Sequence, residues 1–381
     1  MKTVYKIGDA LLSPLGLSTE ENFSAMALGK SAIREHINIP GFPGSFFGAM
    51  MDASCFEVPG LENYTKFEKM LILAAKQAVF QAQIDPSAEN VFFVVASTKG
   101  NIDLIDPEVY PQQENERLYL WKSAELLAQF FGNPNKALVV SQACISGLSA
   151  VIVAKDFLQG TRYEHAVVVG ADTLSRFTFA GFSSLKALAP RPCKPFDLDR
   201  EGLNLGEAAA AMVLSTNPVA NQNGGCVRIA AGAATNDAHH ISAPSRTGEG
   251  LYQALLSCLR DFGRTPDFVN VHGTATLFND EMEALALTRA GLSELPLTAF
   301  KGYFGHSLGA AGLLDLVLAA RCIEEGVLLP VMGFENMGVS YLVAVQTQLE
   351  RRHLSSCLKT ASGFGGSNAV VIMDIVNHKA L

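Results

Sequence analysis

A cysteine stands where an apolar, strand-like stretch gives way to a segment of helical period. The stretch covers residues 137–142, Cys144 follows it, and the helical pattern runs over residues 145–159. At the amino end of a helix, backbone N–H groups without partners and the helix macrodipole stabilise a thiolate, which is the nucleophilic form of cysteine. A cysteine in an apolar segment is more often an ordinary core residue, so Cys144 is a candidate nucleophile that needs partners.

Two histidines occupy segments rich in small residues. His272 directly follows the apolar run at residues 268–271 and opens the sequence His-Gly-Thr-Ala-Thr. A histidine in a loop at a strand end can reach a cavity, whereas one inside a strand usually only packs. His306 follows Gly305 before a run of small residues that begins a helix, and its segment has the spacing of neither common phosphate-binding glycine loop. Both histidines are therefore candidates for catalysis.

A glycine-rich turn lies near the end of the chain. Residues 362–369 read Ser-Gly-Phe-Gly-Gly-Ser-Asn-Ala and precede an apolar run. Glycines around a single aromatic residue indicate a backbone that bends closely past a site, with Phe364 in the turn. The same pattern also fits an ordinary hairpin turn.

The composition is typical of a globular protein with a large apolar core. Hydrophobic residues make up 49% and charged residues 17% of the 381 positions, and the mean hydropathy is +0.21. A net charge of −8 without long runs of like charge argues against nucleic acid and anionic membranes as partners. The most apolar stretches are too short or too polar to span a bilayer. Seven cysteines without a C-x-x-C pair indicate neither a disulfide framework nor a zinc site, which suits a cytoplasmic protein.

Apolar runs typical of buried strands alternate with segments of helical period. The runs lie at residues 91–97, 137–142, 165–170 and 268–271, and the helical segments at residues 67–81, 118–131, 145–159, 250–260 and 310–324. This alternation predicts α/β layering around a largely parallel sheet. A stretch rich in Pro, Asn and Gly at residues 217–225 predicts a linker between two similarly ordered halves. Residues 171–205 are predicted to form a long structured loop that carries function.

Together these segments resemble the β-ketoacyl synthases of fatty acid and polyketide assembly. The chain carries, in this order, A-C-x-S-G, P-F-D-x-D-R-x-G, H-G-T-x-T, K-x-x-x-G-H and G-F-G-G-S-N-A, at residues 143–147, 195–202, 272–276, 301–306 and 363–369. The resemblance covers nearly the whole chain from about residue 90. It implies an α/β thiolase fold of two similar α/β halves in a layered α-β-α-β-α arrangement, with the nucleophile in residues 1–216 and the two histidines in residues 226–381.

The resemblance also implies a role for each motif residue. Cys144 would carry the acyl group, and His272 and His306 would face the malonyl group. Phe364 would gate the acyl pocket, and its backbone N–H would join that of Cys144 in an oxyanion hole. The resemblance assigns supporting charges to Lys301 and Glu207 and substrate-binding hydroxyls to Thr274 and Thr276. It assigns a structural role to Asn368 and Asp280.

The partners implied by the resemblance are an acyl carrier protein and a second synthase-type chain. The carrier would bring acyl and malonyl groups on its phosphopantetheine arm, so the chain would need no cofactor or metal of its own. The second chain would be either another copy in a homodimer or a chain-length-factor-like homologue in a heterodimer. Since a net charge of −8 would repel an acidic carrier, we expect basic residues at the tunnel mouth, with Lys66, Lys69 and Arg200 as candidates.

Other functions remain as alternatives. A chain-length-factor subunit keeps the fold and lacks the chemistry, but such subunits commonly replace the nucleophile, and this chain has Cys144 and both histidines. Thiolases and acyl-CoA-primed synthases use Cys-His-Asn or Cys-His-Cys sets in place of Cys-His-His. A cysteine hydrolase is not favoured, since no residues supply its ordered base and orienting group. The sequence does not choose between fatty acids, aryl polyenes and other polyketides as the product.

Overall fold

Two sets of five strands join into one mixed sheet. The computed structural model describes residues 2–42, 44–106, 115–219 and 225–377. Within these ranges the first half of the sheet contains β1 (Tyr5–Leu12), β4 (Val91–Ala96), β5 (Leu138–Val140), β6 (His165–Asp172) and β8 (Ala208–Ser215). The second half contains β9 (Gly225–Asn236), β10 (Val269–Asn270), β11 (Leu297–Thr298), β14 (Ser356–Gly363) and β15 (Ser367–Asn377).

The two halves repeat one strand order. The sheet runs β11-β10-β14-β15-β9-β1-β8-β6-β4-β5. When the strands of each half are counted along the chain, both halves read third, second, fourth, fifth, first from the outer edge inwards. The halves meet where β1 pairs antiparallel with β9 through Tyr5–Arg228 and Lys6–Val227. The boundaries at residues 216 and 226 stay a prediction, and residues 220–224 of the expected linker lie outside the described ranges.

The expectation of a largely parallel sheet is wrong. Only β5–β4, β4–β6, β14–β10 and β10–β11 are parallel among the pairs of this sheet in the described ranges. The other neighbouring pairs are antiparallel. Strand β8, which is antiparallel to both its neighbours, begins with four alanines. Alanine is depleted in strands, so this fully buried segment carries little strand signal, and the sequence pattern did not predict it.

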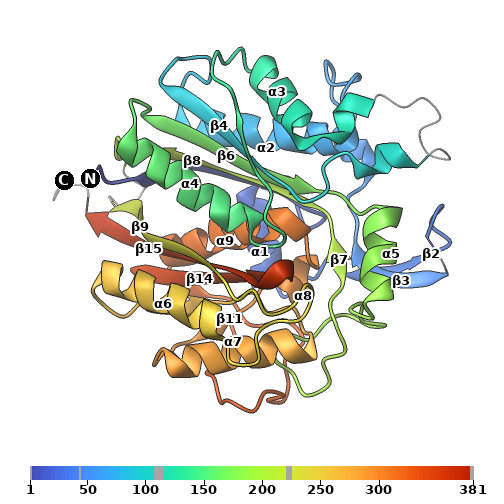
Figure 1. Ribbon diagram of the computed structural model, residues 1–381, viewed down its shortest axis with the longest axis vertical. Coiled ribbons are helices and arrows are strands. Elements are labelled where there is room, and N and C mark those ends of the chain that lie inside the picture. The colour runs from blue at the N-terminus through green and yellow to red at the C-terminus, as the bar shows by residue number, and fades with distance from the viewer. Residues whose placement is uncertain (1, 43, 107–114, 220–224, 378–381) are drawn as a thin grey trace.

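Helices and sheet halves alternate in five layers (Figure 1). The outer helices on the first half are α2 (Lys66–Ala82) and α3 (Leu120–Phe130), the middle layer contains α4 (Ser146–Gly160) and α9 (Ala311–Glu325), and α6 (Glu249–Phe262) and α7 (Leu277–Arg289) cover the second half. Apolar clusters fill the spaces between the layers. The α-β-α-β-α arrangement expected from the resemblance is confirmed.

One segment of the described ranges, Ala143–Gly160, is long and apolar enough to cross a bilayer. It contains α4, which lies in the middle layer between the two halves of the sheet (Figure 1). More than half of the segment is buried inside the protein. Its apolar character is therefore explained by its place in the core.

The segment at residues 171–205 is not one continuous loop. It contains α5 (Arg176–Ser184), which begins after Ser175, whose hydroxyl accepts the N–H of Thr178. An amino-terminal cap of this kind fixes the first turn of a helix. The remaining short elements are α1 (Thr19–Ala27), β2 (Arg34–Ile37), β3 (Ser45–Ala49), β7 (Leu205–Gly206), α8 (Lys301–Phe304), β12 (Val327–Leu328), β13 (Glu350–Arg351) and 3₁₀ turns at Ala53–Phe56, Ile102–Ile105, Asn115–Leu118, Leu308–Ala310 and Phe364–Gly366.

Candidate active site

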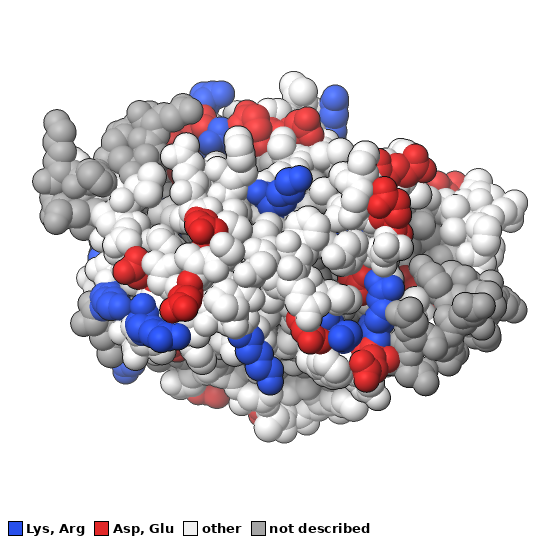
Figure 2. All heavy atoms as spheres, turned by 90° about the horizontal axis from the view of Figure 1, so that it is seen from above, with Lys and Arg blue, Asp and Glu red and all other residues white. Residues whose placement is uncertain are grey.

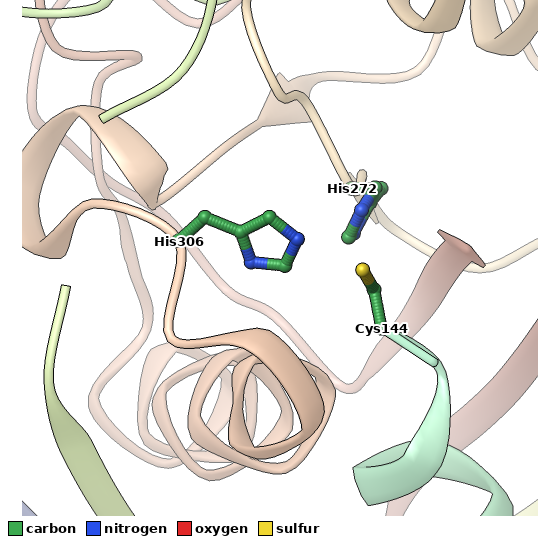
Figure 3. Close-up of side chains that lie close together, drawn as sticks. All are labelled: Cys144, His272 and His306. Atoms are coloured by element: carbon green, nitrogen blue, oxygen red, sulfur yellow. The ribbon is translucent and has the colours of Figure 1, made fainter. Parts of the chain in front are cut away.

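Cys144 lies in a tight turn between β5 and α4. Ala143 before it has a left-handed φ of 46°. The hydroxyl of Ser146 fixes this turn, because it accepts the N–H of Gln142 at 2.8 Å and donates to the carbonyl of Ala143 at 2.6 Å. The cysteine is only 7% exposed. The turn directs its sulfur toward two imidazoles that come from the second half of the chain (Figure 3).

His272 follows the carboxyl end of β10, and its backbone is held by side chains from two directions. Glu283 on α7 accepts the N–H of His272 at 2.8 Å and that of Gly273 at 2.7 Å. The hydroxyl of Thr360 on β14 lies 3.2 Å from the same His272 nitrogen. The carbonyl of His272 accepts a hydrogen bond from Lys301 at 2.6 Å. These contacts fix the direction in which the imidazole projects.

His306 is positioned by a glycine turn and by backbone pairing with the first half. Gly305 has a φ of 68°, a conformation that glycine adopts without strain. The N–H of His306 then donates to the carbonyl of Asn204 at 2.7 Å, and its own carbonyl accepts the N–H of Gly206 at 3.1 Å. His306 is therefore held against β7 and against Asn204, the residue before this strand.

The three side chains converge in a buried cluster. The Cys144 sulfur and one nitrogen of each imidazole all lie within 4.8 Å of one another. The imidazole rings of His272 and His306 are 5.1 Å apart and nearly perpendicular. In the described part of the chain, Nδ1 of His272 and both ring nitrogens of His306 have no hydrogen-bond partner. Buried polar atoms without partners are uncommon and indicate groups that are kept free for a ligand.

Both imidazoles are held in the neutral form. Burial lowers the pKa of His272 and of His306 well below 6.5, and the nearby ammonium groups of Lys301 and Lys359 act in the same direction. A neutral imidazole can donate its N–H to an oxygen that becomes negative. The three ligand atoms also have the spacing of a metal site, but the two ammonium groups disfavour a cation there.

The thiol of Cys144 does not follow the expectation of a resting thiolate. Burial raises its pKa to about 11, while the ammonium of Lys301 and the N–H of Phe364 act in the opposite direction. Helix α4 begins only at Ser146, two residues after the cysteine. Loss of water around the sulfur therefore outweighs the stabilising groups, and the thiol is protonated at neutral pH until a base accepts its proton.

The Phe364 turn covers a small cavity over the three side chains. The cavity has a volume of about 80 Å³, and its lining includes the three converging residues together with Phe182, Thr274, Thr276, Gly363 and Phe364. Phe364 is 37% exposed, and its ring stacks on Phe182 at a centroid distance of 5.6 Å. Thr274 and Thr276 are linked by a hydroxyl–hydroxyl contact of 2.9 Å. The aromatic pair and the threonine pair thus border the same opening.

Gly363 comes very close to the cysteine. A Cβ atom on Gly363 would lie 3.0 Å from the backbone nitrogen of Cys144. The next residue, Phe364, directs its own N–H toward the cysteine sulfur, since this group stabilises the thiolate form. A glycine therefore keeps two backbone N–H groups accessible beside the nucleophile.

Charged residues beneath the site were only partly identified from the sequence. Lys301, which the resemblance assigned, is buried against the carbonyl of His272 and against Asp315 on α9. Glu283 was given no role from the sequence, although its carboxylate holds the His272 backbone. Its burial, which the sequence does not show, marks it as a paired group, because glutamates are almost never buried unless paired. Lys359 was missed entirely, since a lysine in a strand usually faces solvent.

Glu207 does not reach the cavity. Its carboxylate accepts the N–H groups of Met51 at 2.7 Å and Leu174 at 3.0 Å, and it pairs with Lys66 at 2.6 Å. None of these residues is among those that line the cavity. Glu207 thus joins β3, the end of β6 and α2, and supports the site only through the fold.

Arg200 is not a surface residue, so its assignment to carrier docking is wrong. It is 7% exposed, and its guanidinium donates to the carbonyls of Asp197 and Gly338 and, at 3.3 Å, to that of Leu277. A guanidinium has five donors in a rigid fork, which suits it to hold several backbone carbonyls together. The motif around residues 195–202 therefore uses its arginine to join loops.

Asp280 and Asn368, the two polar residues expected to be structural, are buried in hydrogen-bonded positions. Asp280 accepts the N–H of Phe196 at 2.8 Å. Asn368 accepts from the hydroxyl of Ser362 at 2.8 Å and donates to Asp237 at 3.0 Å. Asp280 thus fixes the backbone of Phe196, and Asn368 links Ser362 to Asp237.

Comparisons with known proteins identify the family of this chain. The family model for the N-terminal domain of β-ketoacyl synthases matches residues 1–220, and the C-terminal model matches residues 226–335. The 3-oxoacyl-[acyl-carrier-protein] synthase 2 of Vibrio cholerae is 26% identical and spans 97% of this chain and 98% of its own length. A tetracenomycin polyketide synthase ketoacyl synthase alpha subunit from Streptomyces glaucescens is 26% identical and spans 82% of this chain and 81% of its own.

Solved structures show the same fold. The ketosynthase ApeO in complex with its chain length factor ApeC, from Xenorhabdus doucetiae, covers 98% of both chains with a TM-score of 0.89 at 24% identity. A β-ketoacyl synthase from Burkholderia phymatum covers 99% of this chain and 100% of its own, with a TM-score of 0.86 at 21% identity. The matching family models extend over most of the sequence. The chain therefore belongs to the β-ketoacyl synthase family.

Proposed function

We propose that the chain is an acyltransferase that condenses an acyl group on Cys144 with a malonyl thioester and releases CO₂. The observation that carries this proposal is the buried convergence of one thiol and two neutral imidazoles within 4.8 Å. Together with the family membership, this arrangement supplies a nucleophile and two hydrogen-bond donors without a metal.

In the first half-reaction the sulfur of Cys144 attacks the carbonyl of an acyl thioester. The pKa of about 11 means that the attacking thiol must lose its proton, and a neutral imidazole nitrogen in the cluster can accept it. The proton then passes to the leaving thiolate, so the products are acyl-Cys144 and a free carrier thiol. The N–H groups of Cys144 and Phe364 would hold the oxyanion of the tetrahedral intermediate.

In the second half-reaction a malonyl thioester loses CO₂. The negative charge moves to the thioester oxygen of the resulting enolate, and the N–H groups of His272 and His306 would stabilise it. The enolate carbon then attacks the carbonyl of acyl-Cys144. The sulfur of Cys144 leaves as a thiolate and takes a proton from water, and the β-ketoacyl product remains on the carrier. The free ring nitrogens of His306 support this use of the site.

An acylation and decarboxylation experiment tests the function. The protein is incubated with an acyl thioester and its intact mass is measured, and then a ¹⁴C-carboxyl malonyl thioester is added and ¹⁴CO₂ is counted. We expect one acyl group on Cys144, loss of that group on condensation, and release of one equivalent of CO₂. A chain-length-factor subunit, the alternative, would take no acyl group and form no product.

We also propose a dimer through the β5 edge of the sheet. β5 is the outermost strand of the sheet on the side of the first half, and Val139 on it is 37% exposed. The opposite edge, β11, is buried and bridged by Val345, so in the described ranges it does not offer a comparable open edge. Exposed edge strands pair readily with another chain. The partner would be a second copy or a chain-length-factor-like homologue, and sedimentation of the purified chain, alone and co-expressed with such a homologue, decides between them.

The substrate carrier is proposed to be an acyl carrier protein. A location in the reducing cytoplasm is also proposed, since all seven cysteines are free thiols. Figure 2 shows the face above α2 and α3, where acidic and basic side chains are interspersed and much of the surface is uncharged. Lys66 is already paired with Glu207, which leaves Lys69 as the docking candidate on α2. The Lys69→Glu variant should raise the KM for a carrier-bound substrate and leave the KM for a pantetheine thioester unchanged.

A further inference from the structure

A second lysine lies under the site, and the reaction as described makes no use of it. Lys359 stands in the middle of β14 and is fully buried. It is paired in register with Asn270 on β10, the strand whose end carries His272. Burying an ammonium group costs several kcal/mol unless the charge is paired and hydrogen-bonded. A lysine at this position therefore requires an explanation from its contacts.

Lys359 and Lys301 hold two consecutive carbonyls at the end of β10. Nζ of Lys359 donates to the carbonyl of Val271 at 2.8 Å, and Nζ of Lys301 donates to that of His272 at 2.6 Å. Both ammonium groups share one carboxylate oxygen of Asp315, at 2.7 Å and 3.4 Å respectively. The His272 backbone is thus held through its carbonyl by a buried lysine and through its N–H by Glu283.

We propose that Lys359 is a positioning residue for decarboxylation, which holds the His272 end of β10 in place and adds a positive charge that keeps both imidazoles neutral. The proposal rests on the proposed function, because it assigns Lys359 to the half-reaction in which the imidazole N–H groups act. It also accounts for the shared carboxylate: Asp315 holds both cations beneath the histidines, and each cation lowers the pKa of His272 and of His306.

The surrounding charges give this residue a characteristic pH range. The groups that face it are Asp315 on α9, Lys301 on α8 and Glu283 on α7. Burial lowers the pKa of Lys359 to about 8, with Lys301 acting in the same direction and the two carboxylates against it. Lys359 is therefore charged below pH 8 and neutral above it. When it is neutral, the imidazoles lose a repulsive neighbour and bind protons more readily.

Two variants separate its charge from its hydrogen bond. The Lys359→Gln side chain keeps an N–H donor for the Val271 carbonyl and has no charge, whereas Lys359→Arg keeps the charge at every accessible pH. Both are made in a Cys144→Ala background, and malonyl decarboxylation is measured from pH 5 to 10. Acylation of the matching variants that retain Cys144 serves as the control for folding and access.

The background protein should lose decarboxylation at low pH, where the imidazoles take up protons, and should keep it above pH 8, because the imidazoles stay neutral there whether or not Lys359 is charged. Lys359→Gln should shift the low-pH loss upward, with about a tenfold lower rate per pKa unit at pH values below the new limit. Lys359→Arg should keep the low-pH limit of the background protein. Acylation, measured at a pH above the low-pH limit of every variant so that the imidazole base is neutral, should change by less than about threefold in both.

Two outcomes would overturn the inference, and a third concerns the function itself. If the Lys359→Gln profile superimposes on that of the background, the charge does not act on the histidines. If Lys359→Gln does not fold, Lys359→Arg decides alone, and an upward shift of its low-pH limit despite the retained charge rejects the proposal. Absence of decarboxylation in the background protein at every pH would instead reject the proposed function.

Discussion

Gly363→Ala places one methyl group against the nucleophile. Gly363 has a φ of −143° and a ψ of 165°, which alanine adopts without strain, so the substitution acts through contact alone. The added Cβ would lie 3.0 Å from the backbone nitrogen of Cys144, 3.0 Å from the hydroxyl of Ser367 and 3.2 Å from the Cβ of Ala143. The hydroxyl can rotate away. The backbone nitrogen of Cys144 cannot, because the turn that contains it is fixed by Ser146.

The expected effect is large on catalysis and small on folding. Relief of the contacts at Cys144 requires a shift of a few tenths of an ångström in the turn or in the end of β14. Such a shift displaces one or both N–H groups from the position of the developing oxyanion, and loss of one such donor costs about 10²- to 10³-fold in rate. At 1.36 kcal/mol for each factor of ten, the barrier to acylation should rise by about 3 to 4 kcal/mol.

Single-turnover acylation by a short pantetheine thioester, followed by intact mass, measures this effect directly. Gly181→Ala is the matched control, because a Cβ at Gly181 meets no atom within 4 Å. We expect the control to acylate at the rate of the unchanged protein, and both variants to unfold at similar denaturant concentrations. Acylation of Gly363→Ala at the unchanged rate would refute the placement of the oxyanion hole at this turn.

Other substitutions separate the two half-reactions and test the structural role of Arg200. Cys144→Ala should abolish acylation and condensation and leave CO₂ release, which labelled malonyl thioester will measure. His272→Ala and His306→Ala should each keep acylation detectable and stop or strongly slow CO₂ release; unchanged release in either would remove that histidine from the proposed role. Arg200→Met should lower the free energy of unfolding by about 3 kcal/mol because it leaves buried carbonyls unpaired, without a salt-dependent change in carrier KM. The free energy of unfolding should also fall as the pH drops below about 6.5. The unfolded chain then protonates both histidines, whereas the folded chain, with lowered histidine pKa values, does not. A denaturation midpoint that does not change between pH 5 and 7 would contradict this.

Labelling with iodoacetamide requires a control that the sequence did not indicate. Of the six cysteines other than Cys144, five are buried, but Cys55 is partly exposed. Burial raises the pKa of Cys144 to about 11, which slows its alkylation. Selective labelling of Cys144 is therefore best measured in a Cys55→Ser background.

The predicted strands and helices were most accurate where periodicity was strong. The apolar run at residues 91–97 corresponds to β4, and the helical pattern at residues 67–81 corresponds to α2. Helix α2 also begins at a capping box formed by Thr65 and Glu68. Strand β8 and the antiparallel pairing around it escaped prediction, because a row of buried alanines has no alternation and the direction of pairing depends on contacts distant in sequence.

The motif residues around the nucleophile could be predicted, but the charges that support them could not. Cys144, His272 and His306 each stand at the junction of a strand or a glycine turn with a loop, and that local signal is visible in the sequence. The position of a charged side chain depends instead on which surfaces pack over it. For this reason Arg200 and Lys359, both basic, gave no sequence signal that distinguishes a solvent-facing charge from a buried one.

Their burial changes what these two residues can do. An exposed arginine would attract an acidic partner over a distance of about 10 Å, set by the salt concentration. The buried guanidinium of Arg200 instead holds three backbone carbonyls in fixed positions. The buried ammonium of Lys359 keeps most of its electric effect, because little water separates it from the histidines, and it acts on their pKa values. Burial therefore changes the role of each basic residue: Arg200 fixes the geometry of loops, and Lys359 lowers the proton affinity of the two histidines.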